Sequence, residues 1–300
     1  PNGKTRPLGI PTIVDRIVQQ CILQVLEPIC EAKFHERSNG FRPNRSTEHA
    51  IAQCCRLMQI QHLHYAVDID IHGFFDNVSH GKLLKQMWGM GIRDKKLLCI
   101  VKQMLKAQVV LPDGTRITPT KGTPQGGILS PLLSNIVLNE LDWWVTSQWE
   151  EMPTHYDYKT RQNVRGTDIK SHTYRALRRS NLKEMYIVRY ADDFKIFCRS
   201  RQDAEKAFEA TRLWLKDRLG LEISPEKSKV INLKQRYSEF LGFKMKVYPK
   251  GKNYVVCSHM SDKAVKHAKE KISTAIRAIQ NPADDRAQYI AIQQYNSVVA

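Results

Sequence analysis

The feature that most restricts the fold is a pair of adjacent acidic residues at the tip of an apolar hairpin. Asp192 and Asp193 lie where the apolar segments 185–190 and 194–198 meet, and both segments have the composition of buried strands. Two carboxylates held together there repel each other, and a divalent cation relieves that repulsion. The pair predicts a metal site, with a surface turn that holds two solvated acids as the alternative.

A second acidic strand end lies much earlier in the chain. Segment 65–71 is mostly apolar but contains Asp68 and Asp70. Viewed alone, it also fits an ordinary strand that runs into a turn with solvated acids. Strand ends far apart in sequence can meet in one sheet and supply carboxylates to two metal ions, which activate a 3′ hydroxyl and hold pyrophosphate. Asp70, Asp192 and Asp193 together are therefore typical of nucleotidyl transfer.

The charge balance indicates a polyanionic partner. The 300 residues include 47 Lys and Arg against 30 Asp and Glu, a net charge of +17. Such an excess favours nucleic acid first and an anionic membrane second, and a basic protein without such a partner is the alternative. No apolar run approaches the roughly eighteen residues of a membrane span, so we expect no membrane contact.

The cysteines and the first residues bear on location. The seven cysteines show neither paired spacing nor a disulfide framework, which favours a reduced, intracellular protein. We expect it in the bacterial cytoplasm, or in an organelle matrix if the source is eukaryotic. The chain opens at Pro1 without a signal peptide and already inside a motif, so we expect an excised fragment.

Hydrophobic periodicity predicts a chain that mixes helices and strands. Helices are expected from about residue 15 to Pro28, at 46–61, 80–90, 94–107, 130–149 and 201–219, and after the N-cap Ser261. Strands are expected at 65–71, 185–190, 194–198, 228–233 and 240–248, with a hairpin at 109–118 around Asp113-Gly114.

One basic segment interrupts the apolar pattern. Residues 152–183 contain eight Lys or Arg, two Asp and three Tyr. We expect an exposed insertion that contacts RNA, with a solvated loop as the alternative. The expected RNA-binding residues are Arg161, Arg165, Arg175, Arg178 and Arg179.

Seven motifs in order resemble those of group II intron-encoded reverse transcriptases, also called maturases. They are Arg6-Pro-Leu-Gly-Ile-Pro11, Asp15-Arg16, Gly40-Phe-Arg-Pro43, Asp70-Ile-His-Gly-Phe-Phe-Asp-Asn77, Gly122-Thr-Pro-Gln-Gly-Gly127, Arg189-Tyr-Ala-Asp-Asp193 and Phe240-Leu-Gly-Phe243. The resemblance covers nearly the whole chain. His72 departs from it, since the family commonly has lysine there.

The resemblance implies an α+β, right-hand polymerase fold. Helical and β fingers and an antiparallel-sheet palm would occupy residues 1–258, and the first thumb helices would occupy 259–300. The implied activity is RNA-directed DNA synthesis with two Mg²⁺ ions, an intron RNA template, a DNA primer and dNTPs. The resemblance also implies binding of the intron RNA as a maturase, which assists splicing and mobility.

The resemblance assigns roles to individual residues. Asp70, Asp192 and Asp193 would be catalytic and hold the metals with the Ile71 carbonyl. Phe75 would lie beneath the sugar and exclude a 2′ hydroxyl, with a core aromatic as the alternative. The remaining implied contacts are Gln125 and Gly126 with the incoming nucleotide, Lys4 and Arg6 with its triphosphate, Lys227 with the leaving group, and Phe240, Leu241, Gly242 and Phe243 with the primer end. The alternative for Lys4, Arg6 and Lys227 is a solvated surface charge. Gly122–Gly127 could instead be a plain turn, and Phe240–Phe243 could be a strand that only packs.

Two rival functions remain. An RNA-binding splicing cofactor with a weak or inactive polymerase site would tolerate loss of the aspartates, and their presence argues against it. A palm enzyme with another substrate, such as an RNA-templated RNA polymerase or a cyclase, would need room for a 2′ hydroxyl, which Phe75 would remove.

Overall fold

The computed structural model describes residues 9–111, 113–124, 126–158, 161–162 and 168–299. The chain divides into two compact units, residues 1–233 and 234–300. None of the helices in the described ranges is long and apolar enough to cross a membrane.

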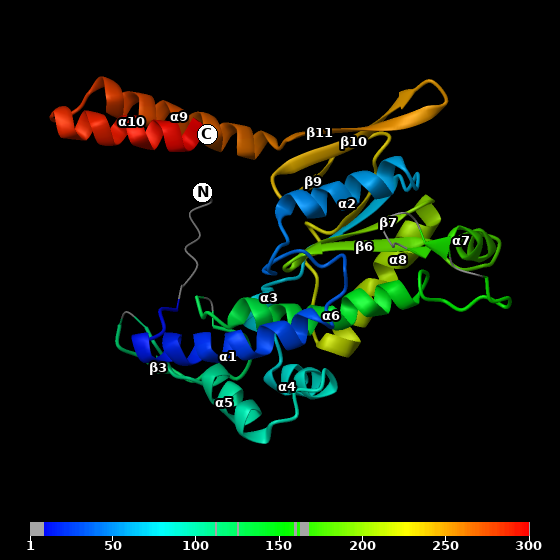
Figure 1. The fold of residues 1–300 in the computed structure, drawn as a ribbon, viewed down its shortest axis with the longest axis horizontal. Coiled ribbons are helices and arrows are strands. Elements are labelled where there is room, and N and C mark those ends of the chain that lie inside the picture. Colours follow the sequence, from blue (N-terminus) through cyan, green and yellow to red (C-terminus); the bar gives the residue numbers. More distant parts are fainter. Residues whose placement is uncertain (1–8, 112, 125, 159–160, 163–167, 300) are drawn as a thin grey trace. The chain divides into compact units, whose positions relative to one another are not determined.

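The first unit is built on a four-stranded sheet. Its strands, in spatial order, are β6 (Met185–Tyr190), β7 (Asp193–Cys198), β1 (Tyr65–Ile69) and β8 (Lys229–Asn232). All neighbouring strands run antiparallel, which confirms the sheet expected for the palm. The two strands expected at 185–198 form one hairpin, and β1 lies beside it (Figure 1).

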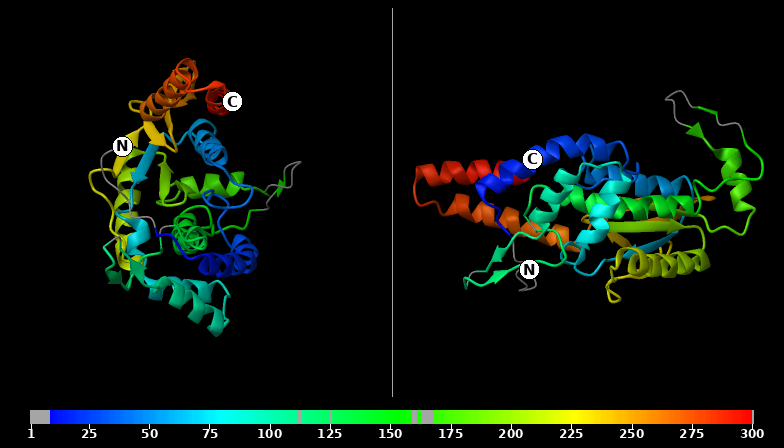
Figure 2. Two further views of the ribbon diagram at one scale, coloured as in Figure 1. Left: turned by 90° about the vertical axis from the view of Figure 1, so that its left-hand side faces the viewer. Right: turned by 90° about the horizontal axis from the view of Figure 1, so that it is seen from below.

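Helices pack on and around this sheet. They are α1 (Ile13–Glu31), α2 (Thr47–Gln59), α3 (Phe74–Asn77), α4 (His80–Gly89), α5 (Lys95–Leu105), α6 (Ser130–Ser147), α7 (Ser171–Arg178) and α8 (Arg201–Trp214), which continues as a π-turn, Leu215–Leu219. Helix α8 packs across β1, β7 and β8, whereas α2 and α6 pack against β6. Helix α1 lies beside α6 (Figure 2). Helix α6 is buried along most of its length, so it links the sheet to the other helices.

The end of α1 differs from the expectation. Pro28 lies inside the helix, which continues to Glu31. Proline removes one backbone donor, but in the last turn this loss affects a single hydrogen bond. Leu26 and Cys30 are buried on either side of it, and the Ala32 N–H donates to the Pro28 carbonyl. Core packing therefore extends the helix past a residue that usually ends one.

The basic segment has more regular structure than an insertion loop. It contains a short hairpin of β4 (Arg161–Gln162) and β5 (Asp168–Ile169), followed by α7. A similar hairpin, β2 (Val109–Val110) with β3 (Arg116–Ile117), forms at the turn expected around Asp113. The right view of Figure 2 shows α7 at the periphery of the first unit.

The second unit begins with a three-stranded antiparallel sheet in the order β11-β10-β9. Its strands are β9 (Ser238–Phe240), β10 (Phe243–Lys250) and β11 (Asn253–Met260). Strand β11 was not expected, because its irregular mixture of polar and apolar residues acquires a strand pattern only when it pairs along β10. The chain reverses between β10 and β11 with Gly251 at φ 61°, a conformation that glycine adopts without strain.

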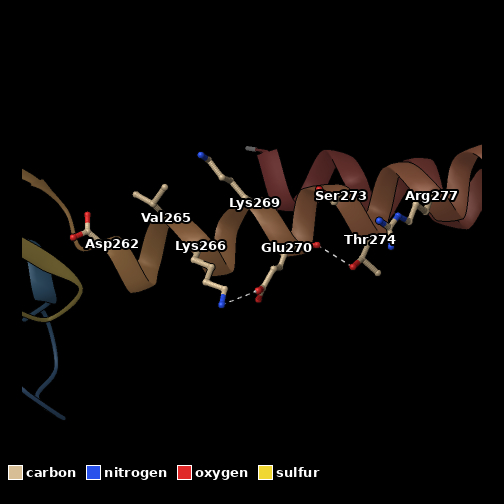
Figure 3. A pocket seen from close by; sticks show the side chains of 8 residues that line it. All are labelled: Asp262, Val265, Lys266, Lys269, Glu270, Ser273, Thr274 and Arg277. Carbon is tan, nitrogen blue, oxygen red and sulfur yellow. Dashed lines mark hydrogen bonds and ion pairs between the residues drawn. The ribbon is translucent and has the colours of Figure 1, made fainter. Parts of the chain in front are cut away.

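Two packed helices complete the second unit. Helix α9 (Asp262–Gln280) starts at the expected N-cap, where the Ser261 side chain accepts a hydrogen bond from the Ala264 N–H. Helix α10 (Asp285–Val299) packs against α9. A hollow of about 570 Å³ follows one face of α9. Apart from Val265, the residues that line it are polar or charged (Figure 3), with Glu270 between Lys266 and Thr274.

Candidate active site

Strands β1 and β7 bring the predicted aspartates together. Their pairing matches Asp68 with Lys195. Because the strands run antiparallel, a step of two residues forward from Asp68 on β1 corresponds to a step of two residues back from Lys195 on β7. Asp70 therefore lies opposite Asp193. Side chains alternate along a strand, so these four side chains lie on one face of the sheet. The first unit therefore gathers three carboxylates and one ammonium group at the end of β1.

Asp193 shows the electrostatic result. Its side chain reaches solvent, yet surrounding protein atoms reduce the hydration of its carboxylate. That desolvation is the largest cause that raises the pKa of Asp193 to about 6. The negative charges of Asp68, Asp192 and Asp70 also raise this pKa, and the charge of Lys195 opposes them. Solvent contact screens part of this shift. A bound cation would relieve the repulsion among the carboxylates that contributes to the rest.

A buried ion pair lies beside this cluster. The Lys195 ammonium group is 2.6 Å from the Asp68 carboxylate, with the two side chains 2% and 15% exposed. Lys195 thus offsets the charge of Asp68, while the other carboxylates of the cluster still raise the pKa of Asp193 after its desolvation. In the described ranges, no group of three or more His, Cys, Asp or Glu side chains has the arrangement of a metal site.

The loop before β8 forms hydrogen bonds with the backbone of Asp70. The Asp70 carbonyl accepts a hydrogen bond from the Ser224 N–H at 2.8 Å, and its own N–H donates to the Ser228 hydroxyl at 3.1 Å. The same loop places the Lys227 Nζ 3.3 Å from the Asp70 Oδ2. Ile71 forms a β-bridge with Ile223. An ammonium group thus contacts the carboxylate that is predicted to hold metal.

The turn that carries Asp192 has an unusual backbone. Tyr190 and Asp193 form the last pair of the hairpin, which leaves Ala191 and Asp192 as its two-residue loop. Ala191 has φ 56°, a left-handed conformation that non-glycine residues seldom adopt. A Cβ atom on Gly40 would lie 2.2 Å from the Ala191 nitrogen. Only glycine at position 40 permits this approach.

The Arg189 side chain holds the Ala191-Asp192 turn in place. Its guanidinium group is fully buried and pairs with Asp142, at 2.6 Å between Nη2 and Oδ2. The same group donates to the carbonyl of Ala191 at 2.8 Å and to the side chains of Asn135 and Ser38. In the sequence, Arg189 is visible only as the first residue of the Arg189–Asp193 motif. The polar Asn135 and Asp142 on the apolar α6 segment were the signal for a buried partner.

Phe75 and the Gly122–Gly127 segment also come together. The Phe75 carbonyl accepts a hydrogen bond from the Thr123 N–H at 2.7 Å, and a Cβ atom on Gly122 would lie 3.0 Å from that carbonyl oxygen. The Phe75 side chain is half-buried, and its ring packs edge-on against Phe74 at 5.3 Å between centroids. Gly126 is exposed with φ 97°.

The predicted primer-contacting residues belong to the second unit. Phe240 and Phe243 pair across β9 and β10, and Leu241-Gly242 forms the tight turn between them, with both residues at positive φ. Phe240 is 2% exposed. The Gly242 carbonyl accepts a hydrogen bond from the Ser261 N–H at 2.7 Å, which ties this turn to the start of α9.

Several predicted residues cannot be placed. Lys4, Arg6, Gln125 and Arg165 lie outside the described residues, as does the side chain of Arg161.

Arg175 and Arg179 are exposed on α7 and at its end. Arg178 donates to both oxygens of the buried Glu184. Charge reversal at Arg178 would therefore disturb the fold as well as any RNA contact.

We predict that Asp142→Asn lowers the free energy of unfolding by about 3 kcal/mol, because it leaves the Arg189 charge buried without its counter-ion. Urea denaturation measures the change. Glu205→Gln, which removes an exposed partner of Arg201, is the matched control and should have little effect. Equal effects of the two substitutions would contradict the anchoring role of Arg189.

Asp193→Asn should stabilise the metal-free protein above pH 6 by about 1 kcal/mol, after allowance for solvent screening. A raised folded-state pKa means that folding takes up a proton between about pH 4 and 6, so the penalty from the charged form is complete above pH 6. The gain should shrink as the pH falls toward 4. Thermal unfolding at several pH values measures it, with the exposed Asp157→Asn as control. A pH-independent gain would refute the raised pKa of Asp193 as the cause.

Comparison with known proteins gives a family. Residues 1–245 match the family model described as reverse transcriptase (RNA-dependent DNA polymerase). Protein YkfC of Escherichia coli is 34% identical over 256 residues, which cover 81% of this chain and 64% of that protein. The group II intron-encoded protein LtrA of Lactococcus lactis is 32% identical over 277 residues, which cover 83% of this chain and 45% of that protein. The chain thus spans less than two thirds of the length of either relative.

A solved structure agrees on the fold. Apo telomerase from Candida tropicalis, truncated from its C-terminal domain, superimposes with a TM-score of 0.52 at 13% identity, over 83% of this chain and 45% of that one. This likeness concerns the fold alone and confirms the predicted right-hand architecture. With the motif order and the family match, it follows that the chain belongs to the reverse transcriptase (RNA-dependent DNA polymerase) family and resembles its group II intron-encoded members.

Proposed function

We propose that the protein is an RNA-directed DNA polymerase that adds dNTPs to a DNA primer on an RNA template. The observation that carries this proposal is the pairing of β1 with β7, which sets Asp70 opposite Asp193 beside the Asp192 turn. We assign the fingers and palm to residues 1–258 and the start of the thumb to 259–300. The structure's own division at residue 233 marks compact units rather than these functional parts.

The aspartate cluster fits divalent cations. Its members are oxygen donors of the kind that Mg²⁺ prefers, and their mutual repulsion adds to the desolvation that raises the pKa of Asp193. We propose that Asp70, Asp192 and Asp193, with the Ile71 carbonyl, hold two Mg²⁺ ions. When bound, such ions polarise phosphoryl oxygens and lower the pKa of the primer hydroxyl. Lys227 would leave Asp70 as metal binds and would be free to meet the negative charge of the leaving group.

The other predicted residues would position the nucleotide and the primer. Phe75 would lie beneath the sugar, held by its backbone contact with Thr123, while Gln125 and Gly126 would line the base and sugar pocket. Lys4 and Arg6 would neutralise the triphosphate, since guanidinium groups suit phosphate oxygens. The turn at Leu241-Gly242 would hold the primer end.

We propose intron RNA binding as a second function of the same chain. The net charge of +17 and the exposed Arg175 and Arg179 support it, because phosphate contacts supply most of the affinity for folded RNA. The group II intron-encoded relative LtrA gives the class of RNA. The alternative, a splicing cofactor with little polymerase activity, predicts RNA binding without primer extension.

Asp192→Asn should abolish primer extension in Mg²⁺ and leave binding of template-primer and of folded RNA nearly intact. The substitution removes one metal-binding charge and almost no surface. Extension of a labelled DNA primer on an RNA template measures activity, and fluorescence anisotropy measures binding. Asp157→Asn is the matched control and should extend normally. Extension by Asp192→Asn within about tenfold of the parent protein would exclude the two-metal assignment.

Phe75→Val should raise incorporation of ribonucleotides relative to deoxyribonucleotides by about tenfold, because the smaller side chain leaves room for a 2′ hydroxyl. Single-nucleotide extension with matched NTP and dNTP pairs gives the ratio of the two efficiencies. The same change at the neighbouring, buried Phe74 is the control, since it should lower stability without changing the ratio. If both substitutions leave the ratio unchanged, Phe75 is a core residue and another group selects the sugar.

A further inference from the structure

The β9–β10–β11 sheet has one face that the proposed polymerase reaction does not use. Cross-strand partners project from the same face of a sheet. The pairing matches Lys244 with His259 and, at successive steps of two residues, Lys246 with Cys257 and Tyr248 with Val255. Tyr237, just before β9, contacts this face as well. We call Tyr237, Lys244, Lys246, Tyr248 and His259 the tyrosine–lysine face.

This face is the open side of the sheet. The alternate residues Met245 and Val247, which point the other way, are 1% and 0% exposed. Tyr237 and Tyr248 are 36% and 40% exposed. An antiparallel sheet with one buried face normally carries polar residues on the other. Large rings on the solvent side are therefore not required for the fold.

The side chains of this face hold one another in place. The Tyr237 and Tyr248 hydroxyls form a 2.7 Å hydrogen bond. The Lys246 Nζ lies 4.9 Å from the centre of the Tyr248 ring and 5.7 Å from that of Tyr237. The Lys244 Nζ lies 5.6 Å from the Tyr237 ring. Cation–π contacts of this kind restrict flexible lysines, so less entropy is lost when a ligand binds.

The charge around the face is strongly positive. Residues 234–260 contain six Lys or Arg and a single acid, Glu239. Glu239 pairs across the strands with Lys244, and Lys244 also bonds Asp262. Among the described residues, no carboxylate forms an ion pair with Lys246. Its ammonium group, between two tyrosine rings, is available to an anion.

We propose that the tyrosine–lysine face binds single-stranded RNA, with a phosphate at Lys246 and a base stacked on Tyr248 or Tyr237. Splayed bases stack on aromatic rings while lysines neutralise the backbone, and this combination is typical of surfaces that bind single strands. An anionic membrane would also need a broad exposed apolar surface, but Met245 and Val247 are buried on the other side, and the aliphatic side chain that shares this face, Val255 opposite Tyr248, is half-buried. The choice of RNA over DNA rests on the proposed function.

Binding of a fluorescein-labelled single-stranded RNA of mixed sequence to the 300-residue chain tests this proposal. Tyr248→Ala should weaken binding about tenfold, because one stacked base is lost, and Tyr248→Phe should bind like the parent. Lys246→Gln should lower the slope of log affinity against log salt by about 0.7. The matched controls are Tyr289→Ala and Arg286→Gln on α10, where both residues are exposed; they should change neither quantity. Unchanged thermal midpoints show that the variants fold.

Three further measurements separate the outcomes. RNA that contains 4-thiouridine should crosslink to the peptide that holds Tyr237 or Tyr248, and crosslinks confined to other peptides would overturn the proposal. A labelled single-stranded DNA of the same sequence should bind more weakly, and equal binding would overturn the choice of RNA. If the substitutions weaken binding to phosphatidylglycerol vesicles but not to RNA, the face is a membrane surface and the proposal fails.

Primer extension on a preannealed hybrid keeps this proposal distinct from the proposed function. Tyr248→Ala should extend the hybrid like the parent protein. If the parent extends primers while Tyr248→Ala and Lys246→Gln bind RNA normally, the tyrosine–lysine face does not bind RNA and the polymerase assignment stands. If the parent does not extend but both variants lose RNA affinity, the face is supported and the polymerase assignment fails.

Discussion

The buried pair of Arg189 and Asp142 is the interaction on which the site depends. Both side chains are 0% exposed, and a buried charge without its partner is strongly destabilising. One guanidinium group joins α6, the loop at Ser38 and the turn at Ala191. Its hydrogen bonds keep Ala191 in a left-handed conformation that its own side chain disfavours. The position of Asp192 is therefore set by the core rather than by the turn.

The register of β1 and β7 is a second feature on which the site depends. It brings Asp70 and Asp193 opposite each other and matches Asp68 with Lys195. Desolvation and the neighbouring carboxylates raise the pKa of Asp193, so the charged form is unfavourable without metal, and the buried Lys195 offsets part of this cost. Functional sites often contain such locally destabilising interactions. A cation that binds at this strand end would offset the repulsion and raise the free energy of unfolding, so metal affinity and folding stability are linked.

Much of this could be predicted from sequence, and the exceptions have physical causes. The hairpin at Asp192-Asp193 is visible because apolar strands and a turn occur within a few residues. The role of Arg189 is not, because its partners on α6 and near Ser38 are distant in the chain. Strand β11 depends on its pairing with β10, and α1 continues through Pro28 because buried neighbours hold its last turn. For Arg178, composition suggested RNA binding, but the structure gives it a buried partner in Glu184.

The central claim is that Asp70 and Asp192 hold divalent metal for nucleotidyl transfer. Crystals of the protein with an RNA–DNA hybrid, an incoming dNTP and Mn²⁺ test it most directly, because Mn²⁺ replaces Mg²⁺ at oxygen sites and scatters anomalously. We predict two anomalous peaks about 3.5–4 Å apart, both within coordination distance of these carboxylates. Peaks that bind the nucleotide without contacting Asp70 or Asp192, or no peaks at this strand end, would contradict the account.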